Sequence, residues 1–100
     1  LGYRVTIATT CGQALAVFRA DPYAFDLVLT DYTMPDRSGL ELATELVRLR
    51  PDLPVVLTTG HVEEFAESEL RAAGIREVLM KPVLLEDLAA GVVRALKPRG

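Results

Sequence analysis

The sequence predicts a single α/β domain in which strands and helices alternate along the chain. Two observations lead to this prediction. Short apolar runs occur four times, and each is followed by a stretch whose apolar residues recur at helical spacing. The connections are short and contain Pro, Gly and Asp, which are typical of turns. Strict alternation of this kind implies a parallel sheet with helices on both faces and right-handed crossovers.

Strands are expected at the four apolar runs. The first run alternates in side-chain character, and the others are nearly continuous, as in strands covered on both faces. The four predicted strands are Tyr3–Ala8, Leu27–Thr30, Val55–Thr58 and Glu77–Met80.

The first two helices are predicted from apolar periodicity together with capping signals. Thr9 or Thr10 can cap a helix over Gln13–Arg19. Ser38 can cap the second helix, and Glu41 stands three residues later, which completes a capping box.

The third and fourth helices complete the pattern. The third is predicted from about Glu63 to Ala73, where Gly74 supplies a left-handed stop. The fourth starts after Leu84, which is a poor cap, and ends before Pro98. The residues expected to face the sheet are Ala14, Leu15 and Phe18 in the first helix, Leu42, Ala43, Leu46, Val47 and Leu49 in the second, Phe65, Ala66, Leu70 and Ala73 in the third, and Leu85, Leu88, Ala89, Val92, Val93 and Leu96 in the fourth.

Composition and charge narrow the classes of function. The chain has 100 residues and 50% of them are hydrophobic, which suits one domain with its own core and excludes disorder. The formal net charge is −3 and the basic residues are scattered, so neither nucleic acid nor a membrane is an expected partner. The first residues do not resemble a signal peptide. The single cysteine, Cys11, is expected to be a small residue at a helix start, and a cytoplasmic location follows from the absence of a disulfide framework.

Polar side chains end the last three predicted strands. They are Asp31, Thr59 and Lys81. Parallel strands end at one edge and lie roughly 5 Å apart, so the three side chains can meet there. A carboxylate nucleophile, a hydroxyl donor and an ammonium group suit an aspartyl phosphate. The alternative is a structural ion pair between Lys81 and Asp31, with Thr59 an incidental strand residue.

Around these strand ends, the sequence resembles the receiver domain of two-component response regulators. The matching motifs are Leu29–Pro35 with Gly39, Pro54–Gly60, and Gly74 with Met80–Pro82. They stand in the order and at the spacing of the family, and they span nearly all of the chain. The resemblance implies a flavodoxin-like fold, a doubly wound parallel sheet.

The resemblance also implies a role in a phosphorelay. A histidine kinase or phosphotransfer protein would donate a phosphoryl group to Asp31 with Mg²⁺, and the backbone carbonyl of Thr33 would be a metal ligand beside Asp31. Thr59 and Lys81 would contact the phosphoryl group and switch an interaction surface formed by the last strands and helix. Thr33 and His61 occupy the two positions that tune the lifetime of the phosphoryl group. Such a domain receives phosphate and is not a substrate-turnover enzyme.

Three further residues, Pro35, Gly39 and Pro82, are expected to be structural at the site. The Thr59-Gly60 pair resembles receiver domains attached to hybrid sensor histidine kinases. The family usually has an aromatic switch residue three positions before the lysine, and Val78 stands there, so an aromatic rotamer switch is not expected.

The chain departs from the family before Asp31. The family begins with a strand that ends in an acidic pair holding Mg²⁺, followed by a helix, and neither is found here. Residues 1–100 are therefore expected to be a receiver domain that is incomplete at its N-terminus. The pairs Glu63-Glu64 and Glu86-Asp87 begin helices and are expected to act on helix dipoles.

Two expectations follow from this departure. Asp31 alone holds Mg²⁺ poorly, so Mg²⁺ binding is expected to be weak or absent and phosphorylation slow or absent. In the family, the missing strand lies between the strands predicted at Tyr3–Ala8 and Leu27–Thr30, so its loss leaves buried edges unpaired. A homodimer, a strand-swapped oligomer or a rearranged sheet is then expected.

Two other functions remain open at this point. A phosphatase of the haloacid dehalogenase type also ends a strand in an Asp nucleophile, but it needs a second Asp where Thr33 stands. A receiver-like interaction or dimerisation module that is not phosphorylated fits the missing acidic pair.

Overall fold

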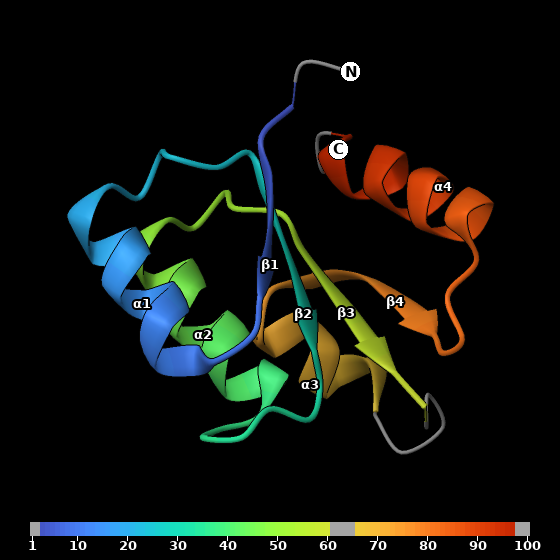
Figure 1. The fold of residues 1–100 in the computed structure, drawn as a ribbon, viewed down its shortest axis with the longest axis horizontal. Helices are drawn as coiled ribbons and strands as arrows, with labels where there is room; N and C mark the ends of the chain where they lie inside the picture. The colour runs from blue at the N-terminus through green and yellow to red at the C-terminus, as the bar shows by residue number, and fades with distance from the viewer. Residues whose placement is uncertain (1–2, 61–65, 98–100) are drawn as a thin grey trace.

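The strands form one parallel sheet in the order β1-β2-β3-β4 (Figure 1). The computed structural model describes residues 3–60 and 66–97. Successive strands are neighbours, so each connection crosses over the sheet and all carboxyl ends share one edge. The strands are β1 (Val5–Ala8), β2 (Leu27–Asp31), β3 (Val55–Thr59) and β4 (Ile75–Met80).

Helices cover both faces of this sheet, as predicted. Side chains of α1, α2 and α3 pack into one apolar cluster with one face, and α4 packs into a second cluster on the other. The predicted α/β class and the order of elements are therefore confirmed. The helices are α1 (Cys11–Ala20), α2 (Gly39–Leu49), α3 (Glu67–Ala72) and α4 (Leu85–Leu96).

The pairing of β1 with β2 changes what was expected of the sheet. The two strands pair directly from Val5 opposite Leu27 to Ala8 opposite Thr30. The backbone carbonyl of Arg4 extends this pairing by accepting from the backbone N–H of Leu27 at 3.3 Å. The prediction that the edges of these two strands stay unpaired is therefore wrong. The predicted alternative of a rearranged sheet is confirmed.

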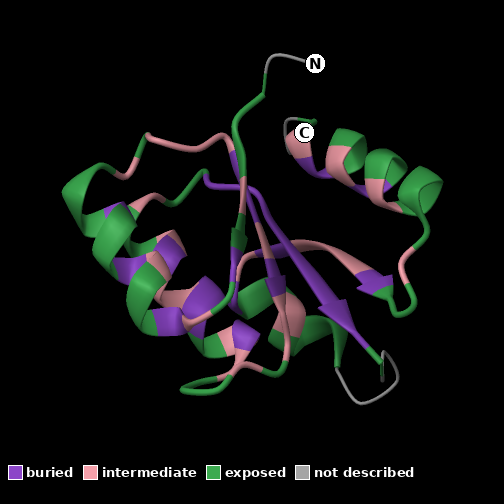
Figure 2. Ribbon diagram, in the orientation of Figure 1, coloured by how far each residue is buried: buried purple, intermediate pink, exposed green. Residues whose placement is uncertain are grey.

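The core is densest around β3 (Figure 2). All five residues of β3 are buried, because helices cover it on both faces and strands flank it on both sides. A continuous apolar run is the sequence signature of such a strand. On the side of α1 and α2, the fully buried side chains Phe18, Leu42 and Leu46 fill the space between helices and sheet.

Helix α4 presents a different face to the sheet from the predicted one. Leu88, Val92 and Leu96 pack against the sheet as expected, but the exposed fractions of Leu85 and Val93 are 82% and 48%. Ala89 is also exposed. The contacting stripe instead includes the buried small residues Gly91 and Ala95.

The small residues explain this rotation of α4. A Cβ atom at position 91 would lie 3.0 Å from Cδ2 of Leu79, so the absence of a side chain lets the helix approach the strand closely. Apolar periodicity alone ranks Leu85 and Val93 above a glycine, and for this reason it points to the wrong stripe.

Several element ends differ from the predictions by a few residues. The strands β1 and β4 begin at Val5 and Ile75, and α1 begins at Cys11. Ala66, predicted to lie inside the third helix, is exposed and is the extended N-cap of α3. The predicted start of that helix, with Phe65, lies outside the described residues. Leu49, at the end of α2, is also more exposed than expected, at 38%.

The predicted helix caps are confirmed. The side chain of Thr10 accepts from the N–H of Gln13, so Thr10 caps α1 and Thr9 does not. Ser38 and Glu41 form the complete capping box of α2. Leu84 is the N-cap of α4 and makes no side-chain capping bond.

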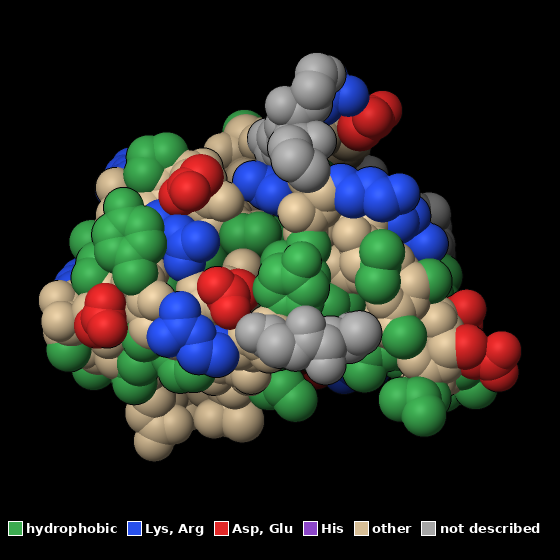
Figure 3. All heavy atoms as spheres, turned by 90° about the horizontal axis from the view of Figure 1, so that it is seen from above, with side chains coloured by type: hydrophobic (Ala, Val, Ile, Leu, Met, Phe, Trp, Pro, Cys, Tyr) green, Lys and Arg blue, Asp and Glu red, His purple; other side chains and the backbone are tan. Residues whose placement is uncertain are grey.

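Charged and apolar side chains share the surface. Figure 3 views the end of the sheet where the strands begin, and Lys and Arg lie there in short groups with acidic and hydrophobic side chains between them. In the described ranges, no helix is long and apolar enough to cross a membrane. The strand β1, at one edge of the sheet, exposes Val5 and Ile7, with exposed fractions of 42% and 68%.

Gly74→Ala is expected to destabilise the domain. Gly74 has φ +81°, and a Cβ there would lie 2.4 Å from Cγ2 of Val47. The free energy of unfolding, measured by urea denaturation, is expected to fall by about 1–3 kcal/mol, because the new alanine would be held at a positive φ that non-glycine residues rarely adopt. Gly60→Ala is the matched control, because its Cβ meets no atom within 4 Å. Equal losses in the two variants would contradict this explanation.

Candidate functional site

Asp31 is the last residue of β2 and lies at the carboxyl edge of the sheet. The buried hydroxyl of Thr30 donates to the backbone carbonyl of Asp31 at 3.1 Å. Gly39 lets α2 start directly behind this residue, since a Cβ at position 39 would lie 2.4 Å from the backbone oxygen of Asp31. The start of α2 therefore lies against the backbone of Asp31, and this close approach supports the structural role predicted for Gly39.

The side chain of Asp31 forms an ion pair with Lys81. Nζ of Lys81 donates to Oδ2 of Asp31, although 50 residues separate them in the sequence. Both side chains are partly exposed, at 33% for Asp31 and 48% for Lys81. Lys81 follows the end of β4, and its backbone N–H donates to the carbonyl of Thr59 at 2.9 Å, which holds the two strand ends together.

The two threonines at the end of β3 have different places. Thr58 stands opposite Asp31 in the β2–β3 register, and Thr59 is the next residue, opposite Met80 of β4. Because side chains alternate between the faces of a strand, Thr58 shares the face of Asp31. Both threonines are buried. Thr58 was not predicted from the sequence, since only the register reveals which threonine shares the face of Asp31.

The other predicted site residues that the structure describes lie in the segments that follow β2 and β4. Thr33 and Pro35 are exposed in the loop after β2, where Thr33 pairs with Ser38 in an isolated antiparallel bridge. Pro82 follows Lys81 through a cis peptide bond. His61 lies outside the described residues.

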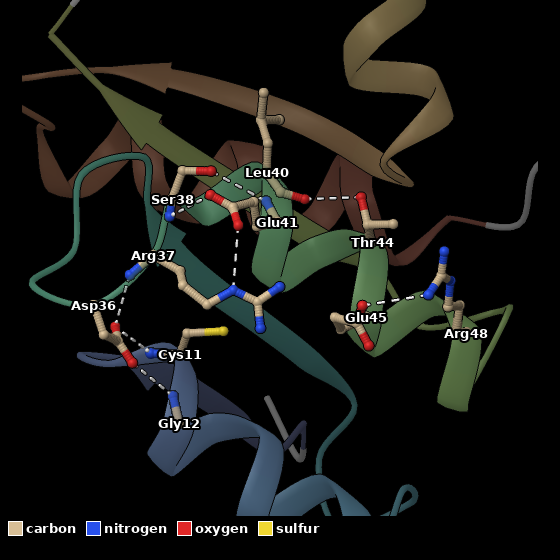
Figure 4. A network of polar contacts seen from close by, with 10 residues as sticks. All are labelled: Cys11, Gly12, Asp36, Arg37, Ser38, Leu40, Glu41, Thr44, Glu45 and Arg48. Carbon is tan, nitrogen blue, oxygen red and sulfur yellow. Dashed lines mark hydrogen bonds and ion pairs between the residues drawn. The ribbon is translucent and has the colours of Figure 1, made fainter.

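Asp36, in the loop after β2, is a further residue near the site that was not predicted from the sequence (Figure 4). Its carboxylate accepts from the backbone N–H groups of Cys11 at 3.0 Å and Gly12 at 2.9 Å, at the start of α1. The N–H of Arg37 donates to the same carboxylate at 3.0 Å. These donors, above all those of Cys11 and Gly12, lower the pKa of Asp36 below its ordinary value. No local sequence signal links residues 25 positions apart.

Beyond Asp36, the network in Figure 4 continues into α2. The guanidinium of Arg37 donates to Glu41 at 3.2 Å, and Glu41 also accepts from the N–H of Ser38 in the capping box. Both contacts lower the pKa of Glu41, the bond from Ser38 most. Cys11 is fully buried under this network, and burial raises the pKa of its thiol.

The donor set at this edge does not fit a divalent metal site. Mg²⁺ takes oxygen ligands in octahedral geometry, with carboxylates as anchors. Within residues 3–60 and 66–97, no group of three or more Asp, Glu, His or Cys side chains could hold a metal ion. Asp31 supplies one carboxylate, which is paired with an ammonium group. The strand β1, which pairs with β2, ends at Ala8 and is followed by Thr9, and neither residue brings a carboxylate.

The fold and the ion pair define a parallel α/β domain with an Asp–Lys site at the carboxyl edge of its sheet. The family model of the response regulator receiver domain matches residues 1–93. The chain therefore belongs to the response regulator receiver domain family. Domains of this family act in two-component signal transduction, and the resemblance stated from the sequence is confirmed.

Curated relatives match most of this chain but are much longer. The two-component response regulator ARR12 of Arabidopsis thaliana is 37% identical over 86 residues, which cover 86% of this chain and 14% of ARR12. The DNA-binding transcriptional regulator NtrC of Azospirillum brasilense is 35% identical over 98 residues, covering 96% of this chain and 20% of NtrC. The chain thus spans a fifth or less of the length of these two relatives.

Solved structures confirm the flavodoxin-like fold. A CheY-like receiver domain protein from Methanospirillum hungatei aligns with a TM-score of 0.82 and 25% identity, over 94% of this chain and 93% of that chain. The response regulator TrrA from Thermotoga maritima, solved in complex with Mg²⁺-BeF, aligns with a TM-score of 0.79 and 22% identity, over 94% and 99% of the two chains.

Acid is expected to weaken the domain partly through Asp36. The pKa of Asp36 is lower in the folded state than its ordinary value of about 3.9. The stability that ionised Asp36 contributes to the fold is therefore complete above this ordinary pKa and is lost as the pH falls through the lower pKa of the folded state. Asp36→Asn cannot titrate, so its unfolding free energy should fall less steeply with pH below about 4 than that of the wild type. Denaturation curves at several pH values measure both slopes. Identical slopes would contradict the assignment.

Proposed function

We propose that this chain is a phosphoacceptor receiver domain that takes a phosphoryl group onto Asp31. The ion pair between Asp31 and Lys81 at the carboxyl edge of the sheet carries this proposal. A partly exposed carboxylate can reach a phosphodonor, and a lysine beside it supplies a compact positive charge for a phosphoryl oxygen.

The chemistry follows from these groups. A carboxylate oxygen of Asp31 attacks the phosphorus of a phosphohistidine on a histidine kinase or phosphotransfer protein. The P–N bond breaks, its electron pair stays on the imidazole nitrogen, and a new P–O bond forms on Asp31. The ammonium group of Lys81 then moves from the carboxylate to a phosphoryl oxygen. A hydroxyl at the end of β3 donates to another: that of Thr59, as the family resemblance implies, or that of Thr58, which the register puts on the face of Asp31.

The same proposal covers the output of the domain. Movement of Thr59 and Lys81 toward the phosphoryl group would shift β3 and β4 and change the surface that β4 and α4 present to a partner protein. Thr33 and His61 would set how fast water removes the phosphoryl group. This activity is a stoichiometric switch in the cytoplasm and turns over no separate substrate.

Mg²⁺ binding is expected to be weak or absent in this chain. Receiver domains generally bind Mg²⁺, and the solved structure of TrrA is a complex with Mg²⁺-BeF. In the described part of this chain, Asp31 offers the metal a single carboxylate. Isothermal titration calorimetry with MgCl₂ is expected to give no saturable heat at millimolar metal, either in the wild type or in the Asp31→Asn variant. Saturable binding in the wild type alone would contradict this expectation.

The second candidate is a receiver-like interaction module that is not phosphorylated. The single carboxylate at the site favours it. The homodimer also remains a prediction, and the exposed Val5 and Ile7 on β1 support it as an association surface. The phosphorylation experiment separates the two candidates.

Incubation with acetyl phosphate, followed by intact-mass measurement, tests the phosphoacceptor. The phosphoacceptor proposal predicts that the wild type gains one phosphoryl group, slowly because Asp31 alone holds Mg²⁺ poorly, with and without Mg²⁺ in parallel samples. Asp31→Asn should gain none, and Asp52→Asn should behave as the wild type, because the side chain of Asp52 is 74% exposed and forms its ion pair with Arg50. Lys81→Gln should react about tenfold or more slowly, since a positive charge is lost from the transition state.

No mass gain in the wild type under either condition would reject phosphorylation of this chain and favour the interaction module. A gain that persists in Asp31→Asn would place the phosphoryl group on another residue.

A further inference from the structure

The loop after β2, residues 32–38, makes polar contacts with β3, α1 and α2, and Figure 4 draws those with α1 and α2. At its start, the N–H of Tyr32 donates to the carbonyl of Thr58 on β3 at 2.9 Å. At its end, the N–H of Gly39 donates to the carbonyl of Tyr32 at 2.7 Å. Between these points the loop projects from the sheet, and Asp36 at its tip binds α1.

The loop supplies the negative charge that lies beside the N-terminus of α1. The first turn of α1 contains no acidic residue, although the N-terminus of a helix carries partial positive charge. Asp36 supplies the missing carboxylate from 25 residues away and accepts from Cys11 and Gly12. A Cβ at position 12 would lie 3.6 Å from Oδ2 of Asp36, so the two segments are in close contact.

The residue after Asp36 is held from the other side. Arg37 forms an ion pair with Glu41 in the first turn of α2. The tip of the loop is therefore fastened to α1 by one side chain and to α2 by the next. The α2 contact is an exposed pair between residues four positions apart, which contributes little. The contact of Asp36 with backbone N–H groups joins distant segments and involves a full charge, so it is the stronger of the two.

We infer that Asp36 is a positioning residue, which binds the tip of the loop after β2 to the start of α1. This contact fixes the positions of the backbone at Asp31 and Thr33. Its consequence for phosphoryl transfer rests on the proposed function, but its effect on the loop does not. A second consequence follows from the geometry. Any displacement of α1 moves the loop, so a contact on α1 can alter the reactivity of Asp31.

A purely structural role for Asp36 as a helix cap is the competing explanation. Thr10 offers the matched comparison, because it caps the same turn of α1 through the N–H of Gln13 and makes no contact with the loop in the hydrogen bonds of the structure. Thr10→Ala and Asp36→Ala both remove a cap from α1. Only Asp36→Ala releases the loop.

Amide hydrogen exchange, followed by NMR, measures the loop without any need for phosphorylation. Asp36→Ala should increase exchange at the N–H groups of Tyr32 and Gly39 by about tenfold, the size expected when a hydrogen bond to a charged group is lost. Thr10→Ala should leave these two rates close to the wild type while it increases exchange at Gln13. Asp36→Asn keeps one acceptor oxygen and should recover part of the protection.

Phosphorylation by acetyl phosphate gives the second measurement. Asp36→Ala should slow the reaction about tenfold through misplacement of the nucleophile, and Asp36→Asn should restore part of the rate. Thr10→Ala should react at the wild-type rate. A wild type that takes no phosphoryl group would reject the proposed function, and the exchange measurement would still decide the role of Asp36.

Two results would overturn the inference. Equal exchange at Tyr32 and Gly39 in Asp36→Ala and the wild type would show that Asp36 does not hold the loop. Equal effects of Thr10→Ala and Asp36→Ala on these amides would show that both act only through the stability of α1.

Discussion

The parallel register of β2, β3 and β4 is the constraint on which the site depends. It places Thr58 opposite Asp31 and Thr59 opposite Met80, so that Lys81 emerges beside a carboxylate 50 residues earlier in the chain. A slip of one residue would turn Asp31 to the other face of the sheet. The full burial of β3 opposes such a slip, because Val55 and Leu57 pack in the cluster on one face of the sheet and Val56 in the cluster on the other.

Much of this arrangement was predictable from the sequence, for local reasons. The spacing of apolar residues along the chain predicts the strands and helices. The capping residues Thr10 and Ser38 are also local signals, and the structure confirms both. The meeting of Asp31 with Lys81 was also predictable, since parallel strands end at one edge. The motif resemblance predicted the family, which the family model confirms.

The remaining features depend on tertiary contacts that no local pattern encodes. The stripe of α4 that meets the sheet is set by close packing of Gly91 on Leu79, and hydrophobicity ranks a glycine low. The family pattern predicts another strand between β1 and β2. No local pattern in the sequence indicates that these two strands pair directly. The anchor at Asp36 joins segments 25 residues apart through backbone N–H groups, whose positions the sequence does not specify.

The outer strand β1 has only four residues, and backbone groups of alternate residues point away from β2. Another chain could therefore form only a short ladder with it. Although Val5 and Ile7 are exposed, so short a ladder suits a weak contact that dilution reverses, and it offers a poor template for an extended fibril. The brevity of β1 therefore limits edge-to-edge association through a strand that exposes apolar side chains.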